Sequence, residues 1–137
     1  MKIVRIDHIA VCVPELAPAL EKWQAVLGLL GGPREYVPSQ LTDAAFLLTP
    51  AQGEACVELI APSPRGKNAG LEKFLDKRGG LHHIAFAVDE LDAALDELAA
   101  RGVELLDRHA RPGARGHRVA FLHPRALGGV LIELVGA

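Results

Sequence analysis

The stretch HIAFAVDEL at residues 83–91 repeats, with three changes, the stretch HIAVCVPEL at residues 8–16. When the chain is compared with itself at an offset of 75 positions, 8 of 13 residues are identical, starting from His8 and His83. A single long period of this kind indicates two similar modules rather than a solenoid of many short repeats. The chain is therefore interpreted as an internal duplication, with a histidine at the start of an apolar strand in each copy.

The same offset, without a gap, pairs CVELI at 56–60 with LIELV at 131–135, so that Glu58 aligns with Glu133. Each glutamate stands within an apolar strand, where burial of an unpaired carboxylate is costly. Such carboxylates are normally neutralised, paired with a cation or bound to a metal. The duplication therefore carries polar residues that need a partner.

Length and composition limit the class of protein. The 137 residues are 50% hydrophobic and 23% charged, as expected for one globular domain. A net charge of −2 argues against non-specific binding of nucleic acid, and no apolar run reaches the ~20 residues that cross a membrane. The N-terminus lacks the pattern of a signal peptide, and Cys12 and Cys56 lie in apolar runs as buried free thiols do. We therefore expect a soluble cytoplasmic domain with no nucleic-acid or membrane partner.

Hydrophobic periodicity predicts the order β-α-β-β-β in both halves, and hence an α+β fold with mixed sheets. A single domain spans 1–137, with module 1 at 1–62, a linking helix region at 63–79 and module 2 at 80–137. The expected elements are a strand at 3–13, a helix at 14–28 and strands near 34–37, 44–49 and 55–61 in module 1, and a strand at 81–88, a helix at 90–101 and strands near 103–108, 117–122 and 130–135 in module 2. Gly28 and Gly102 end the two long helices.

Alternation along the first strand of each module decides which side chains share a face with the histidines. His8 shares its face with Ala10 and Cys12, and these small residues leave room beside the imidazole. His83 has alanines in the corresponding places. His82, one position earlier, is predicted to point to the opposite face and to have a structural role.

One histidine and one glutamate per module stand at a common offset: His8, Glu58, His83 and Glu133. Neutral imidazole and carboxylate suit a divalent transition metal, and four such ligands leave two positions of an octahedron open for a bound molecule. For any one of these residues, a core histidine or an ion-paired glutamate is the simpler interpretation. The coincidence of all four favours a metal site, which a pseudo-twofold axis between the modules would assemble within one chain.

Two βαβββ modules with a histidine and a glutamate in each resemble the vicinal-oxygen-chelate superfamily, which includes glyoxalase I, extradiol dioxygenases and methylmalonyl-CoA epimerases. Within it, the resemblance to the methylmalonyl-CoA epimerase family covers nearly the whole chain. Five stretches carry it: RIDHIAV (5–11), VELIAP (57–62), LEKFLDKRGGLHHIAF (71–86), RPGARGHRVAFLHP (111–124) and GGVLIEL (128–134). The two longest are more specific to the family than the four polar residues, which glyoxalase I would share.

The resemblance implies interconversion of (2R)- and (2S)-methylmalonyl-CoA through a metal-stabilised enolate. It makes the four polar residues the metal ligands and Glu133 the base that removes the C2 proton. The implied cofactor is a divalent ion, Co²⁺ or Mn²⁺ in the first place and Ni²⁺, Mg²⁺ or Zn²⁺ as alternatives. The implied partner is a CoA thioester, and a homodimer is compatible with the family. Two alternatives stay open, namely a glyoxalase I-like lyase or other metalloenzyme of the superfamily, and a metal-free small-molecule binding protein of the same fold.

One segment departs from the epimerase pattern. VPSQLTD (37–43) stands where the family usually has a VPEQGV-like stretch, and Ala44 occupies the place of a second acid–base glutamate, four residues beyond Gln40. Epimerisation needs a proton on the opposite face of the enolate, so the second group is left open; water or the substrate's own carboxylate could supply it. Asp43 has the wrong parity unless a bulge intervenes. Gln40 is a candidate for substrate binding.

The loop RPGARGHR (111–118) is rich in glycine and arginine. Three of its arginines are candidates for binding the phosphates of the CoA arm: Arg111, Arg115 and Arg118. A solvated hairpin turn explains the same composition equally well. His123 belongs to the family motif, and a structural hydrogen bond is expected for it rather than catalysis. His109 and His117 are expected at the surface.

Overall fold

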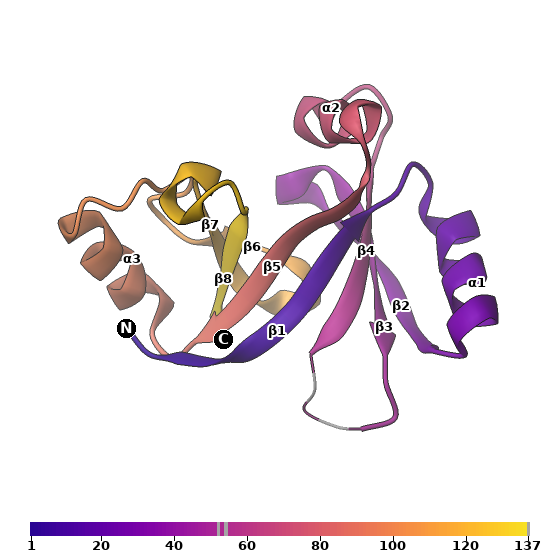
Figure 1. The fold of residues 1–137 in the computed structure, drawn as a ribbon, viewed down its shortest axis with the longest axis horizontal. Coiled ribbons are helices and arrows are strands. Elements are labelled where there is room, and N and C mark those ends of the chain that lie inside the picture. The colour runs from indigo at the N-terminus through magenta and orange to yellow at the C-terminus, as the bar shows by residue number, and fades with distance from the viewer. Residues whose placement is uncertain (52, 54, 137) are drawn as a thin grey trace.

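The computed structural model describes residues 1–51, 53 and 55–136, through which one mixed sheet of eight strands runs (Figure 1). The strands and α-helices are β1 (Ile3–Cys12), α1 (Leu16–Leu27), β2 (Leu30–Val37), β3 (Thr42–Leu48), β4 (Cys56–Pro62), α2 (Ala69–Lys77), β5 (Gly80–Val88), α3 (Leu91–Ala100), β6 (Arg111–Pro112), β7 (Arg118–Leu122) and β8 (Ile132–Gly136). Short 3₁₀ helices are η1 (Pro38–Gln40), η2 (Ala114–Gly116) and η3 (Pro124–Leu127).

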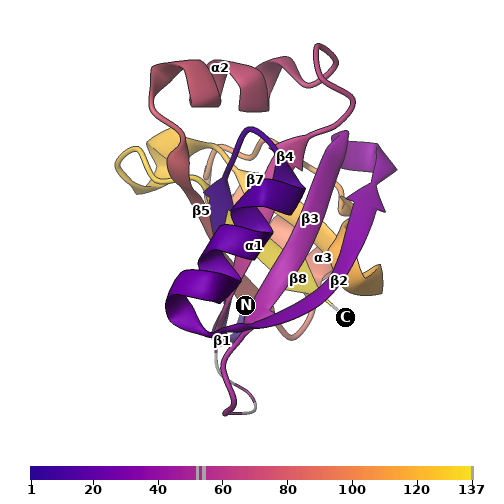
Figure 2. The same ribbon diagram turned by 90° about the vertical axis from the view of Figure 1, so that its right-hand side faces the viewer.

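The strand order β2-β3-β4-β1-β5-β8-β7-β6 places the first strands of the two modules side by side at the centre of the sheet. β1 and β5 are antiparallel to each other, β1 is parallel to β4, and β5 is parallel to β8. Both modules therefore have the same arrangement about a pseudo-twofold axis between β1 and β5. This confirms the predicted α+β fold of two βαβββ modules. Figures 1 and 2 show the sheet curled, with α1 and α3 near its opposite ends.

Each module has its own hydrophobic core between its long helix and its part of the sheet. In module 1, Leu16 of α1 lies in a buried cluster with Val11 of β1. In module 2, Leu95 of α3 lies in a cluster with Leu134 of β8. Because burial of such a side chain stabilises the fold by about 1.5–3 kcal/mol, the helices are held firmly on the outer face. The long helices α1 and α3 therefore do not cover the inner faces of β1 and β5.

The linking helix α2, predicted from LEKFLDK, covers one end of the inner face. Asn68 caps it, because its Oδ1 accepts a hydrogen bond of 3.0 Å from the backbone N–H of Leu71. The Leu71 side chain packs with Ala10, Cys12 and Ile60 in a third buried cluster. The link between the modules is therefore part of the folded structure.

The helices are short and end where the sequence predicts. Gly28 adopts the left-handed conformation, with φ 67° and ψ 19°, and its N–H donates to the carbonyl of Gln24. Gly102, after α3, has φ 78°. Only the start of α1 differs, since Pro14 lies before the helix and Glu15, with an extended backbone, is the N-cap. No helix in the described part of the chain is long and apolar enough to cross a membrane.

The strand predicted near 103–108 is absent from this described segment. Leu105 makes only an isolated bridge to Leu122. The backbone N–H groups of Leu106 and Asp107 both donate to the carbonyl of Phe121, so the regular ladder cannot continue. The edge of the sheet is formed by the two-residue strand β6, which pairs with β7. Module 2 therefore has a shorter outer strand than the eight-residue β2 of module 1.

Candidate metal centre

Four polar side chains from the central strands meet on the inner face of the sheet. The register places Ala10 opposite Glu58 and Ala85 opposite Glu133, which are equivalent pairs in the two modules. The four residues His8, Glu58, His83 and Glu133 are all buried, with exposed fractions of 4–6%. The structure thus brings together, within one chain, the set that the duplication singles out.

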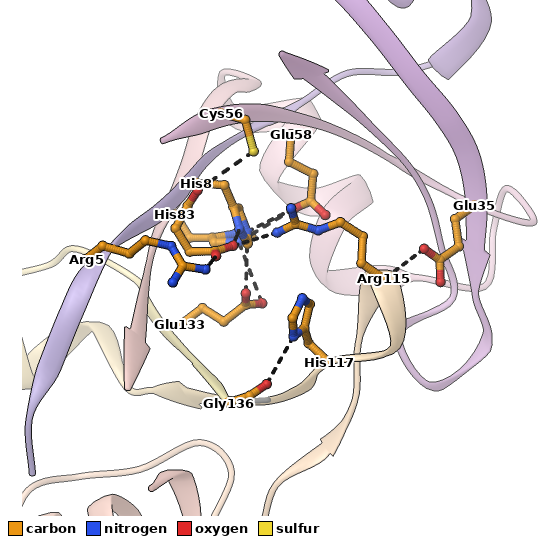
Figure 3. A network of polar contacts seen from close by, with 11 residues as sticks. Arg5, His8, Glu35, Cys56, Glu58, His83, Arg115, His117, Glu133 and Gly136 are labelled. Carbon is orange, nitrogen blue, oxygen red and sulfur yellow. Dashed lines mark hydrogen bonds and ion pairs between the residues drawn. The ribbon is translucent and has the colours of Figure 1, made fainter. Parts of the chain in front are cut away.

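The donor atoms of these side chains point at one another (Figure 3). Nε2 of His8 lies 3.3 Å from Glu58 Oε1 and 3.4 Å from Glu133 Oε1. Nε2 of His83 lies 3.9 Å from Glu58 Oε1 and 3.8 Å from Glu133 Oε2. One donor atom from each of His8, Glu58 and His83 fits within a group in which all distances are at most 4.8 Å. Glu133 is not part of this three-residue group, although its carboxylate lies beside both imidazole nitrogens.

This donor set fits a divalent metal ion. Both Nε2 atoms are buried and have no hydrogen-bond partner among the described residues. An orphaned buried nitrogen is costly, and a cation at the centre would use both lone pairs and offset the charges of the two carboxylates. The residues present thus fit the divalent ion that the sequence predicts.

His8 is held by a charged network that the sequence analysis missed. The carboxylate of Asp7, the residue before it, accepts a hydrogen bond of 2.8 Å from His8 Nδ1. Arg5 and Arg115 donate to the same carboxylate at 2.8 and 2.6 Å. The hydrogen bond from His8 is the main cause that holds the pKa of Asp7 well below its usual range; burial opposes it and Arg115 assists. The only sequence signal was an aspartate directly before the histidine.

His83 has a neutral neighbour instead. His82 Nδ1 lies 2.8 Å from His83 Nδ1, and the His82 ring meets Phe74 edge to face. The prediction that His82 points to the opposite face is wrong. The β1–β5 ladder pairs Ala10 with His83 but Val11 with Leu81, so His82 is the extra residue of a bulge and stays on the inner side.

In the metal-free protein, burial and neighbouring charges shift the pKa values of Glu133, His8 and His83 in different directions. Burial raises the pKa of Glu133 to about 8; the charge of His8 opposes this shift and that of Glu58 adds to it. For His8, burial works against protonation, but the hydrogen bond to Asp7 and the charges of Glu58 and Glu133 outweigh it and raise the pKa to about 9. Burial holds the pKa of His83 well below its usual value. Glu133 can therefore exchange a proton near neutral pH.

A cleft of about 380 Å³ opens on one side of the four residues. Glu58, His82 and His83 line its inner end, and Leu106, Phe121 and Leu131 give it an apolar wall. The rest of its wall comes from 39–42, Ile60, 67–71, Asp107 and Arg111. A much smaller pocket on the other side is lined by His8, Phe46, Arg115 and Glu133, among others. Glu58 and Gln40 border both spaces, whereas Glu133 borders only the smaller one.

The three candidate arginines of the loop have different surroundings. Arg111 lines the cleft, with Nη1 donating to the carbonyl of Ser39 at 3.2 Å. Arg115 turns away from the cleft toward Asp7 and lies over the ring of Phe46 at 3.9 Å. Arg118 is exposed and forms two 2.8 Å hydrogen bonds with Asp92 of α3. Only Arg111 is therefore placed to meet a molecule in the large cleft.

The remaining sequence candidates are also located. Gln40 is half-buried between the two spaces, while Ala44 is buried on β3 and offers no titratable group. Asp43, with opposite parity, lines neither space. His123 Nδ1 accepts a hydrogen bond from the backbone of Arg125, the expected structural role.

The two surface predictions for histidines have different outcomes. His109 is exposed, as expected. His117 is half-buried and borders the smaller pocket, and its Nδ1 donates to the carbonyl of Gly136 at 3.2 Å. The prediction of a surface position is wrong for His117, because η2 folds the loop back over the metal centre.

Comparisons with known proteins cover nearly the full chain. The sequence model of the glyoxalase/bleomycin resistance protein/dioxygenase superfamily matches residues 7–121. The chain is 33% identical over 135 residues to the ethylmalonyl-CoA/methylmalonyl-CoA epimerase of Cereibacter sphaeroides, covering 96% of this chain and 97% of that protein. It is 40% identical over 131 residues to the uncharacterised protein YqjC of Bacillus subtilis, covering 95% and 90%. A variant of the Streptomyces coelicolor methylmalonyl-CoA epimerase, in complex with 2-nitronate-propionyl-CoA, matches with a TM-score of 0.89 at 33% identity and 99% coverage of both chains.

Proposed function

Because the chain belongs to the methylmalonyl-CoA epimerase family of the glyoxalase/bleomycin resistance protein/dioxygenase superfamily, we propose that it interconverts (2R)- and (2S)-methylmalonyl-CoA. The observation that carries the proposal is the meeting of two histidines and two glutamates, from equivalent strands, beside a cleft of about 380 Å³. Such a cleft is large enough to hold an acyl thioester with its end at the polar cluster.

The reaction is a proton transfer at one carbon. The C2–H bond lies between a thioester and a carboxylate, so its bonding electrons can move onto the thioester oxygen as the proton leaves. A divalent ion held by the four residues would stabilise the negative charge on that oxygen. Return of a proton to the other face of C2 gives the epimer, with atoms and electrons conserved.

Glu133 is proposed as the group that takes the proton. Its carboxylate is buried beside both imidazoles, and burial raises its pKa to about 8 in the metal-free protein, which favours uptake of a proton; the charge of a bound ion would act in the opposite direction. For the opposite face, neither Ala44 nor Asp43 offers a group at the centre. We propose that water in the cleft or the substrate's own carboxyl group delivers a proton to that face, and that the proton taken by Glu133 passes back to this donor, so that both groups return to their starting states.

We propose Co²⁺ or Mn²⁺ as the bound ion, with Ni²⁺, Mg²⁺ and Zn²⁺ as alternatives. Mixed imidazole and carboxylate ligands suit first-row divalent ions, and two free positions would accept two substrate oxygens. His8, Glu58, His83 and Glu133 would hold the ion through the atoms that converge in the structure. Metal content after purification and reconstitution, read by elemental analysis, tests this assignment.

The activity is tested by following the C2 proton of methylmalonyl-CoA in deuterated water. Protein loaded with Co²⁺ or Mn²⁺ should exchange this proton, and a His109→Ala variant, changed at an exposed histidine, should behave like the unaltered chain. Absence of exchange at full metal occupancy contradicts the proposal. Turnover of a glutathione hemithioacetal in its place would favour a glyoxalase I-like lyase, and ligand binding without turnover would favour a binding protein.

We further infer that the protein works in the cytoplasm as a homodimer. Both cysteines are free and buried, as is usual in a reducing compartment. Ile3, Val4 and Ile6 at the outer end of β1 are exposed, and clustered apolar side chains of this kind favour an interface. Light scattering at micromolar concentration should give a dimer that an Ile6→Lys substitution converts to a monomer; a monomeric unaltered chain contradicts the inference.

A further inference from the structure

Two bulges stand at equivalent places in the modules. Asp7 and His82 are 75 positions apart, and each is the unpaired residue of a bulge in the β1–β5 ladder. Each directly precedes a candidate ligand histidine and has an atom 2.8 Å from the Nδ1 of that histidine. We propose that His82 is a positioning residue that fixes the tautomer and orientation of His83, as Asp7 does for His8. The inference rests on the metal site of the proposed function.

The positions of the protons follow from which nitrogen faces the centre. Nε2 of His83 points at the two glutamates and has no other partner in the part of the chain that the structure describes, so it must carry the lone pair that binds the ion. A neutral His83 then has its proton on Nδ1, which donates to Nδ1 of His82. The reverse arrangement would put a proton on Nε2 of His83 and block ligation. His82 therefore selects the tautomer that can bind a metal.

The surroundings of the two bulges explain why one partner is charged and the other neutral. Asp7 receives hydrogen bonds from Arg5 and Arg115. The residues at the same offset in the other module are Gly80 and Gln40, which carry no charge. The two arginines that bind Asp7 thus have no charged equivalent at the matching positions, and a neutral imidazole nitrogen accepts the hydrogen bond from His83 without needing a counter-charge.

Aromatic contacts hold both rings of the second pair in place. The ring of Phe74, from the linking helix α2, meets His82 edge to face with centroids 4.8 Å apart. The ring of Phe121, from β7, meets His83 in the same way at 5.2 Å. The aromatic contacts pack the two rings, and the hydrogen bond between the rings adds the tautomer and the final orientation of His83, so its loss should weaken metal binding more than the stability of the fold.

The test compares two substitutions of similar size. His82→Asn keeps an acceptor oxygen where Nδ1 lies, while His82→Leu has none. Metal-free protein is titrated with Co²⁺ against a competing chelator, and unfolding midpoints of the metal-free variants show whether each folds. Loss of the acceptor should weaken Co²⁺ binding by about 10–100-fold in His82→Leu, as is typical for a group that orients a metal ligand, and His82→Asn should stay within about threefold of the unaltered chain.

A second readout reports the proton itself. In the Co²⁺ form, the Nδ1–H of each ligand histidine gives a strongly shifted proton signal that disappears in deuterated water. The His83 signal should persist in His82→Asn and be lost or exchange faster in His82→Leu, while the His8 signal stays unchanged. Equal Co²⁺ affinity and equal signals in the two variants overturn the inference, and so does an equal loss in both. Failure of the unaltered chain to bind Co²⁺ would instead contradict the proposed metal site.

Discussion

Glu58 and Glu133 are equivalent in the duplicated sequence, yet they face different spaces. Glu58 borders the cleft of about 380 Å³ as well as the small pocket, whereas Glu133 borders only the small pocket behind the centre. The difference arises from the segments on the two sides of the metal centre. On the side of the small pocket, η2 and Arg115 lie close to the centre. On the side of the large cleft, apolar residues line an open space. Duplication can thus supply two equivalent glutamates and still place them against different spaces.

The largest expected effect separates these two glutamates. Glu133→Gln retains an oxygen donor but cannot take a proton, so exchange at C2 should fall by roughly 10²–10⁴ at saturating metal. Glu58→Gln should mainly weaken metal binding and keep its exchange once metal is saturating. Proton NMR of methylmalonyl-CoA in deuterated water measures both.

Equal losses of exchange in the two metal-saturated variants would refute Glu133 as the base. A Glu58→Gln variant that exchanges the proton but no longer inverts C2 would sharpen the comparison, because it would assign the opposite face to Glu58.

Removal of the metal should lower the melting temperature, and more so at higher pH. In the metal-free fold the pKa of His8 is raised from 6.5 to about 9 and that of Glu133 from 4.5 to about 8, burial being the main cause for Glu133. A group with a raised pKa stabilises the fold below its unfolded pKa, and that stabilisation is lost as pH rises through the folded value. The lowered pKa values of His82 and His83 act in the opposite sense below about pH 6.5, so the metal-free protein should lose stability between about pH 6.5 and 9.

Melting curves of chelator-treated and Co²⁺-loaded protein across this range measure the effect. The gap between the two forms should widen as pH rises, because the ion takes the place of the protons. If the difference in melting temperature between the two forms does not change with pH, the protonation of His8 and Glu133 is not coupled to folding.

Substitution of Asp7, the partner of His8, should destabilise the protein more than substitution of His82, the partner of His83. Asp7→Asn removes a charge that His8, Arg5 and Arg115 share, and the loss should be about 1.5–3 kcal/mol, at the lower end because both arginines are partly exposed. His82→Asn replaces one neutral acceptor by another and should cost less than about 1 kcal/mol. Urea unfolding of the metal-free variants gives both values, and equal values would remove this distinction between the modules.

The smallest expected effects concern two arginines of one loop. Arg111→Ala should raise the KM for methylmalonyl-CoA by about tenfold, because its guanidinium lies in the cleft wall. Arg118→Ala should leave kcat and KM within about twofold, since Arg118 pairs with Asp92 on the outer surface. Steady-state kinetics at fixed metal tests both. A larger change for Arg118 would place the CoA arm along α3.

The sequence predicts the features of the structure that occur in both modules of the duplication. His8 and His83, Glu58 and Glu133, and the first strands that carry them are placed correctly, because one offset and one alternation determine them. His82 is misplaced because strict alternation does not allow for a bulge, and nothing in a run such as GLHHIAF marks where a ladder gains a residue. Asp7 is missed for the same reason, since alternation would turn it to the outer face.

Ion pairs between residues far apart in the chain could not be predicted from the sequence either. The partner of Arg115 is Asp7, 108 positions away, and that of Arg118 is Asp92, 26 positions away. A charged loop shows its composition in the sequence but not which carboxylate folding brings to it. The segment 103–108 has residues typical of a strand. The backbone N–H groups of Leu106 and Asp107 nevertheless both donate to the carbonyl of Phe121, and no sequence motif in the segment indicates this geometry.

The position of α2 has a consequence for how the centre assembles. Each module supplies one imidazole and one carboxylate, so half a chain could complete the set only by collision with another half. The segment from Pro62 to Gly80, with α2 packed on the sheet, joins the halves covalently. A short tether corresponds to an effective concentration of order millimolar, far above that of most proteins in a cell. Formation of the four-ligand set is therefore a unimolecular event, and dilution, which separates oligomers, leaves it intact.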